Sequence, residues 1–204
     1  MNIELIVVGK TDSKEINALV DNYTKRINFY NRFNITYIPD IKNTKSLSES
    51  QQKTSEGEAI IRLLEPTDRV VLLDEHGSEF RSIEYADWLQ KRMNSGVKRL
   101  VFIIGGPYGF SEALYARANE KISLSKMTFS HQIIRAIFTE QLYRAFSILH
   151  NSPYHHELFC CDNAAIYCRY PKNQQWAVLQ VQPIAVFIGR AWYLPHFDNK
   201  IILS

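Results

Sequence analysis

The sequence predicts an α/β protein with a mostly parallel sheet and helices on both faces. Two observations indicate this. The apolar stretches at residues 3–8, 70–73 and 100–104 are short and do not alternate with polar residues, as is typical of strands buried on both faces. Segments with apolar residues at helical spacing separate them, so strand and helix follow each other along the chain.

The first part of the chain fits this order. A strand over Ile3–Val8 precedes a helix that begins with a capping box of Asp12 and Glu15. That helix carries apolar residues at positions 16, 19, 20, 23 and 27. A strand over Phe33–Ile38 follows. The polar, serine-rich stretch Lys42–Gly57 is then expected to be a mobile loop that runs into another helix.

The second part repeats the order. The expected elements are a strand over 70–73, a helix from Ser82 to Gly96, a strand over 100–104, a short helix from Ser111 to Ala118, a strand over 122–124 and a long helix over 131–149 capped by Ser130. Ligands of such sheets bind at the carboxyl ends of the strands. We therefore expect a site in the loops after Leu73, at Gly105–Gly109 and at Ser125–Ser130.

Composition limits the class of protein. The chain has 204 residues, 46% of them hydrophobic and 22% charged, which is normal for a globular protein with a core. It shows neither a signal segment nor an apolar run of about 18 residues, so a cytoplasmic location without a membrane is expected. Cys160, Cys161 and Cys168 match no common zinc spacing, so we expect no metal.

Net charge is +3, and residues 158–204 supply +2 of it through four basic and two acidic side chains. The remaining chain is nearly neutral, which excludes RNA binding through a broad electrostatic field. Any contact with RNA must use local basic patches or an assembled ribonucleoprotein surface.

Four segments carry possible chemistry, and each also has an ordinary interpretation. Gly105–Gly109 is neither a dinucleotide motif nor a phosphate loop, and a tight strand-to-helix turn explains it equally well. Ser123–His131 has main-chain groups and apolar side chains that suit a flat heterocycle, although taken alone it is better explained as an ordinary strand-to-helix connection. Glu140 and Arg144 have the spacing of a surface ion pair. Asn151–Glu157 is rich in polar and aromatic groups.

Together these segments resemble the ribosomal RNA large subunit methyltransferase H family, the 23S rRNA pseudouridine N3-methyltransferases of the SPOUT superfamily. The resemblance covers residues 1–157. It rests on six motifs in one order, at residues 3–10, 72–77, 102–109, 124–131, 140–145 and 151–157.

The resemblance implies a deep trefoil knot at the C-terminal end of the domain, a homodimer, and S-adenosyl-L-methionine as cofactor. It implies cofactor contacts at Leu73, Gly105, Leu124, Ser125, Lys126, Met127, Thr128 and Phe129. The implied substrate is a pseudouridine in helix 69 of 23S rRNA, on the assembled ribosome. The implied cofactor contacts fall in the three loops that are expected at the carboxyl ends of the strands.

Methylation at N3 of such a base requires that its proton be accepted. The candidate acceptors are His131, His155 and Glu140, or water. A histidine is favoured, because its reference pKa of about 6.5 suits neutral pH.

Contacts with RNA need cations and aromatic rings. Arg135, Arg144 and Lys10 are the candidates for phosphate contacts, and Tyr154 is expected to stack on a base or close the pocket.

Residues 158–204 differ from the rest and form a C-terminal extension. The stretch 177–182 alternates like a strand, Pro183 interrupts it, and residues 184–188 are apolar. The segment is too apolar for disorder and too short to bury a core of its own. It is interpreted as an accidental, non-native extension, as an element docked on the domain, or as a partner-binding segment. The accidental extension is favoured, because the residue pattern of 158–204 is not that of a designed unit.

Two other functions stay open. One is a non-catalytic ribosome-binding or assembly factor whose cofactor pocket is blocked by the extension. The other is a nucleotide-binding α/β enzyme that uses Gly105–Gly109 for phosphate, which the lack of a phosphate-binding lysine disfavours.

Overall fold

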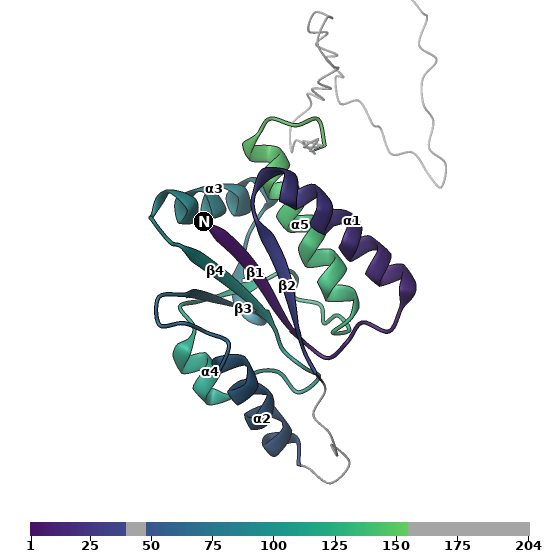
Figure 1. Cartoon of the computed structure of the whole chain (residues 1–204), viewed down its shortest axis with the longest axis vertical. Helices are drawn as coiled ribbons and strands as arrows, with labels where there is room; N and C mark the ends of the chain where they lie inside the picture. The colour runs from purple at the N-terminus through teal and green to yellow at the C-terminus, as the bar shows by residue number, and fades with distance from the viewer. Residues whose placement is uncertain (40–47, 155–204) are drawn as a thin grey trace, which may run out of the picture. The chain divides into compact units, whose positions relative to one another are not determined.

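A computed structural model describes residues 1–39 and 48–154. Its five strands form one parallel sheet in the order β2-β1-β4-β3-β5 (Figure 1). The strands are β1 (Asn2–Val8), β2 (Phe33–Ile38), β3 (Arg69–Glu79), β4 (Arg99–Ile104) and β5 (Glu120–Ser123). The predicted α/β class and parallel sheet are confirmed.

Helices cover both faces of this sheet. They are α1 (Lys14–Tyr30), α2 (Glu49–Ile61), α3 (Ser82–Asn94), α4 (Glu112–Arg117) and α5 (Ile133–Leu149). Helix α5 packs against α1 and α3 on one face, while α2 packs against α4 on the other (Figure 1). In β1, Leu5 and Val7 join the core under the first group, and Ile6 and Val8 join the core under the second. This explains why β1 is apolar without alternation.

Several predicted boundaries were wrong. Ser13, not Asp12, caps α1, since its Oγ accepts the Ile16 N–H at 3.2 Å. Helix α2 already begins at Glu49 through a capping box of Ser48 and Gln51, so the expected loop is helical from residue 49. The earlier part of that stretch, residues 42–47, lies outside the described residues.

Two more helix starts differ. Helix α3 begins at Ser82, with Arg81 as its N-cap, because the Glu84 carboxylate accepts the Arg81 N–H at 2.8 Å. Helix α5 begins at Ile133, two residues later than predicted. Ser130 still caps locally, since its Oγ accepts the Ile133 N–H at 3.3 Å.

The amino ends of the strands are tied together around Glu120, at the start of β5. Its carboxylate accepts hydrogen bonds from Arg69, Trp88 and Arg92 at 2.6–3.0 Å. Burial raises the pKa of Glu120, but the bonds from Arg92, Trp88 and Arg69 outweigh it and hold the pKa below its ordinary value. This network fixes the edge of the sheet opposite to the predicted site.

Membrane spans and metal clusters are both absent from residues 1–39 and 48–154. None of the helices there combines the length and apolar character that a bilayer crossing requires. Within the same ranges, no group of three or more His, Cys, Asp or Glu side chains is placed to hold a metal ion. The three cysteines and residues 158–204 lie outside these ranges.

Candidate functional site

The three loops selected from the sequence lie at one edge of the sheet. One follows β4, one follows β5, and the third interrupts β3 after Leu73. These strands are neighbours, with Leu72 beside Ile103 and Leu73 beside Ile122. Neighbouring strands lie about 4.8 Å apart, so Leu73 and the carboxyl ends of β4 and β5 fall within roughly 10 Å. Leu73 and Leu124 are half-buried and pack against the same core. The geometry therefore allows one ligand to contact all three loops.

The loop after Leu73 is an excursion within β3. Both Leu73 and Ser78 pair with Ile122, so residues 74–77 bulge out of the ladder. Gly77 lies against the backbone of β5, where a Cβ would come within 2.5–2.7 Å of Ile122 and Lys121 backbone atoms. Glycine is therefore required for the close approach of the two strands.

Asp74 holds this excursion in place. Its carboxylate accepts hydrogen bonds from the Tyr115 hydroxyl at 2.5 Å and the His76 N–H at 2.8 Å. Burial raises the pKa of Asp74, but the bonds from Tyr115 and His76 outweigh it and lower the pKa from its ordinary value. Because Tyr115 belongs to α4, the contact ties that helix to the excursion of β3.

The glycine loop after β4 is a tight turn. The Gly109 N–H donates to the Gly106 carbonyl at 3.1 Å, and Gly109 has a φ of 80°. A Cβ on Gly106 would overlap the buried carboxylate of Glu56, from α2. Helix α2 thus supports the back of this turn, while Gly105 and Gly106 are half-buried at its front.

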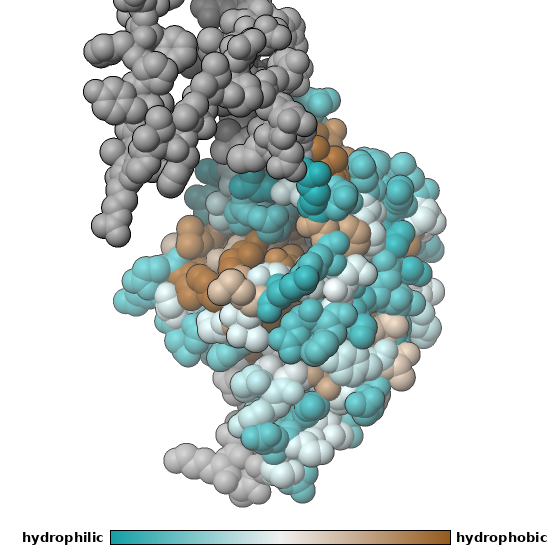
Figure 2. Space-filling view, turned by 180° about the vertical axis from the view of Figure 1, so that it is seen from behind, coloured by the Kyte–Doolittle hydropathy of each residue, from teal (hydrophilic) through white to brown (hydrophobic). Residues whose placement is uncertain are grey.

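The loop after β5 exposes apolar side chains. Ser125 organises its first part, since its Oγ accepts the Met127 N–H at 2.9 Å and its carbonyl accepts the Ser123 hydroxyl at 2.9 Å. Met127 is 75% exposed and Phe129 is 41% exposed. Figure 2 shows that apolar side chains gather on one part of the surface seen from behind. Exposed apolar side chains such as those of Met127 and Phe129 suit a flat heterocycle more than a phosphate.

The start of α5 is bonded to the turn between β1 and α1. Gln132 accepts the N–H groups of Asp12 and Ser13 at 3.2 and 3.4 Å, and its amide donates to the Asp12 carboxylate at 3.1 Å. Exposed Lys10 lies in the same turn, and exposed His131 directly precedes Gln132. Lys10 and His131 thus lie at the same edge of the sheet as the three loops.

The prediction for Arg135 is corrected by the structure. Its side chain is 1% exposed, and its guanidinium donates to the Val8 carbonyl and to Thr11 Oγ1, each at 2.6 Å. A buried guanidinium engaged by groups of its own chain is out of reach of an RNA phosphate.

Glu140, Arg144 and Tyr154 form a second group farther along α5. Both Glu140 oxygens accept hydrogen bonds, from Arg144, Gln141 and Tyr154 at 2.5–3.2 Å. The hydroxyls of Tyr154 and Tyr23 lie 3.2 Å apart. Burial, the contact with Tyr23 and the charge of Glu140 together raise the pKa of Tyr154.

This second group is distant from the three loops in one copy of the chain. At about 1.5 Å per residue, Arg144 lies roughly 16 Å along α5 from Ile133, and the Tyr154 ring packs beside the same part of the helix, with its centroid 5.1 Å from the Arg144 guanidinium carbon. The carboxylate of Glu140 already accepts several donors, which disfavours it as a proton acceptor compared with exposed His131. His155 lies outside the described residues.

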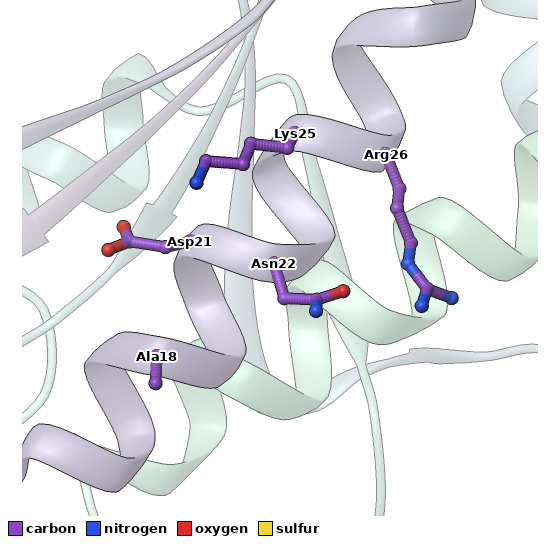
Figure 3. A pocket seen from close by; sticks show the side chains of 5 residues that line it. All are labelled: Ala18, Asp21, Asn22, Lys25 and Arg26. Atoms are coloured by element: carbon purple, nitrogen blue, oxygen red, sulfur yellow. The ribbon is translucent and has the colours of Figure 1, made fainter.

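A shallow hollow on α1 contains none of the predicted residues. Figure 3 shows the side chains that line it, which are Ala18, Asp21, Asn22, Lys25 and Arg26. They come from one face of one helix and carry mixed charges. The Arg26 guanidinium carbon also lies 5.9 and 5.5 Å from the ring centroids of Tyr23 and Tyr143, beside the Tyr154 group.

Sequence reasoning missed the contacts that support the loops. Thr11, Gln132, Glu56 and Tyr115 were not singled out, because each acts on a residue far away in the chain. Of the supporting features, only Gly77 could have been recognised from the sequence around it, because a glycine inside a polar segment indicates that two backbone segments approach closely.

Comparison with known proteins identifies the class. The family model described as "Predicted SPOUT methyltransferase" matches residues 1–155. A solved structure, described as a "Probable Methyltransferase" from Bordetella pertussis Tohama I, aligns with a TM-score of 0.45 at 10% identity, over 71% of this chain and 94% of that one. The class of protein defined by the family match is thus the SPOUT methyltransferases.

Curated relatives narrow the class. "Ribosomal RNA large subunit methyltransferase H" of Flavobacterium johnsoniae is 60% identical over 157 residues, which is 77% of this chain and all of the relative. The protein of the same name from Parabacteroides distasonis is 58% identical over the same shares. The chain belongs to the ribosomal RNA large subunit methyltransferase H family, as the sequence motifs predicted.

Proposed function

We propose that this protein is an S-adenosyl-L-methionine-dependent methyltransferase that modifies N3 of a pseudouridine in helix 69 of 23S rRNA, on the assembled ribosome in the cytoplasm. The observation that carries the proposal is the placement of three loops, matching the family motifs, on adjacent strands at one edge of the sheet: after β4, after Leu73 within β3, and after β5. Family membership supports the reaction class, and the names of the relatives support a ribosomal RNA substrate.

The cofactor fits the groups present at this edge. Leu73, Gly105 and Leu124 would hold it with main-chain groups and half-buried apolar surface, and Ser125, Lys126, Met127, Thr128 and Phe129 would cover it. Bound S-adenosyl-L-methionine supplies an electrophilic methyl group. The knotted threading implied by the family is part of the proposal, as it would fix the loops for binding.

The chain's own contribution is to orient the base and to take its N3 proton. His131 is the favoured acceptor, because it is exposed at the end of the loop after β5. His155 remains the second candidate, and Glu140 the third. Lys10 would contact a phosphate, and Arg144 with Tyr154 would contact RNA near the other end of α5.

A homodimer is part of the same proposal. Since Arg144 lies roughly 16 Å along α5 from the loops, one copy spreads the predicted RNA residues widely. A second copy that placed its own α5 beside the loops would bring both groups to one substrate. Its two-fold symmetry would create two equal sites.

The test is methyl transfer to purified ribosomes, with the modified nucleotide located by mass spectrometry of the rRNA. We expect one methyl group on a helix 69 pseudouridine, and little transfer to free RNA. Of the variants His131→Ala, His155→Ala and Glu140→Gln, the first should lose most turnover. Wild-type turnover in all three variants would exclude a side chain of these residues as the proton acceptor. If calorimetry detects no binding of S-adenosyl-L-methionine, a non-catalytic ribosome-binding factor is favoured instead.

A further inference from the structure

The clearest unassigned feature of the candidate site is the buried cation at the start of α5. Arg135 donates to the carbonyl of Val8, the last residue of β1, and to the hydroxyl of Thr11 in the following turn. Its guanidinium carbon lies 5.9 Å from the centroid of the Tyr37 ring, on β2. Arg135 therefore fastens the first turn of α5 to the carboxyl ends of β1 and β2.

The position of this attachment decides where the loop after β5 must run. The loop leaves Ser123 at the edge strand β5, whereas Val8 belongs to β1, three strand positions away. At about 4.8 Å per strand this separation is roughly 14 Å. Of the strands in between, β4 ends at Ile104, just before Gly105, and the pairing of β3 with β5 is interrupted after Leu73. The segment from Ser123 to Arg135 thus spans the end of β4 and the interruption of β3 after Leu73, and the loops at these two places complete the candidate cofactor site.

Between its two attachments the segment has exposed side chains. Residues 126–131 are all exposed, and the hydroxyls of Ser125 and Ser130 accept N–H groups only two and three residues further along the chain. Gln132 adds a second attachment to the same turn through Asp12 and Ser13. The course of the loop is therefore set mainly at its ends, by β5 on one side and by Arg135 with Gln132 on the other.

We propose that Arg135 is a positioning residue for cofactor binding, which acts by holding the far end of the loop 124–130 across the end of β4 and the interruption of β3 after Leu73. It contacts neither cofactor nor RNA, and it works through Val8 and Thr11. This rests on the proposed function of the loops. A guanidinium suits the task, because its planar fork donates in two fixed directions at once, whereas an ammonium on a shorter stem does not.

The test compares three variants of the full chain. Arg135→Lys keeps the charge and loses the fork, and Thr11→Val removes one acceptor while keeping the shape of the side chain. Leu142→Val is the matched control, because it trims a buried side chain of the same helix away from these contacts. Hydrogen exchange of amides 126–134 should accelerate in the first two variants and not in the control.

Cofactor affinity gives the second measurement. Arg135→Lys should raise the Kd of S-adenosyl-L-methionine about tenfold or more, with kcat at saturating cofactor nearly unchanged. Adding Thr11→Val to Arg135→Lys should add little, because both changes break the same contact. Unchanged exchange in both Arg135→Lys and Thr11→Val would overturn the proposal.

An RNA role for Arg135 gives a different result. Ribosome binding would then weaken, its salt slope would fall by about one, and cofactor affinity would stay the same. If the wild-type protein binds no S-adenosyl-L-methionine, the proposed function fails, while the exchange data still decide whether Arg135 positions the loop. If Arg135→Lys does not fold, Thr11→Val carries the test.

Discussion

A single methyl group added at Gly77 tests whether the close contact of β3 with β5 builds the candidate site. In Gly77→Ala the new Cβ would lie 2.5–2.7 Å from three backbone atoms of Lys121 and Ile122. Carbon atoms prefer separations of at least about 3.5 Å, so the two strands must part by about 1 Å. Backbone cannot rotate away as a flexible side chain can, and the displacement therefore passes directly into β5.

The cost follows from this displacement. Overpacking costs about 1–3 kcal/mol, and a weakened ladder bond adds about 1 kcal/mol. For a protein of this size a total near 3 kcal/mol lowers Tm by roughly 6–12 °C. Leu124 follows Ile122 by two residues, so the Kd of S-adenosyl-L-methionine should rise as well. Thermal unfolding and titration calorimetry measure the two effects.

Gly96→Ala is the matched control, since Gly96 follows α3 with a φ of 77° and a Cβ at this position would meet no atom within 4 Å. Left-handed backbone costs an alanine about 1–2 kcal/mol, and the stiffer unfolded chain offsets about 0.4–1 kcal/mol. Cofactor affinity should not change. The reasoning is refuted if Gly77→Ala loses no more stability than Gly96→Ala and binds the cofactor like the wild type.

Three further changes test other parts of the structure. Glu120→Gln should destabilise the protein by about 1–3 kcal/mol at pH 7, because it weakens charge-assisted hydrogen bonds. The folded-state pKa of Glu120 is lowered, so the extra stability of the wild type over the variant is present above the unfolded pKa and disappears as pH falls through the folded pKa. In urea unfolding from pH 7 to pH 3, the free energies of unfolding of wild type and variant should therefore converge. Tyr115→Phe removes one bond to Asp74, so it should cost about 1 kcal/mol and bring the pKa of Asp74 closer to its ordinary value, which carboxyl-carbon NMR titration measures. Lys10→Ala should weaken ribosome binding and reduce its salt slope by about one, with thermal stability unchanged within about 0.5 kcal/mol.

The strands that sequence predicted well are those with a local pattern of their own. Residues 3–8 and 100–104 were placed correctly within a residue, because burial on both faces leaves an apolar run, interrupted in the first strand only by Glu4. Residues 33–38 were recognised by alternation. The second half of β3 was missed, since residues 74–79 are mostly polar and the strand was expected to end at Leu73, with a loop after it. They belong to the strand because Ser78 and Glu79 pair with β5, a contact between residues far apart in the chain.

The candidate site was predictable in its loops and not in its supports. The edge of the sheet follows from strand order and general rules for parallel sheets, and the motifs lie in the loops at that edge. Arg135 looked like a surface cation, as arginines usually are. Its burial depends on Val8 and Thr11 lying beneath α5, and no spacing within residues 131–149 contains that information.

The three loops are held in place by different kinds of contact, and this difference determines which loop loses most conformational freedom when a ligand binds. The loop after β3 is fixed by the Asp74 carboxylate and by the contact of Gly77 with β5, and the glycine loop is backed by Glu56. The loop after β5 is held at its ends and exposes residues 126–131. When a ligand binds, the loss of conformational entropy therefore falls mainly on this last loop. It costs about 1–2 kcal/mol for each backbone residue that becomes fixed. Trimming an exposed side chain such as Met127 removes only its own contact with the ligand. Loosening an end attachment increases the number of conformations that every residue of the loop must give up, so cofactor affinity should depend more on Arg135 than on Met127.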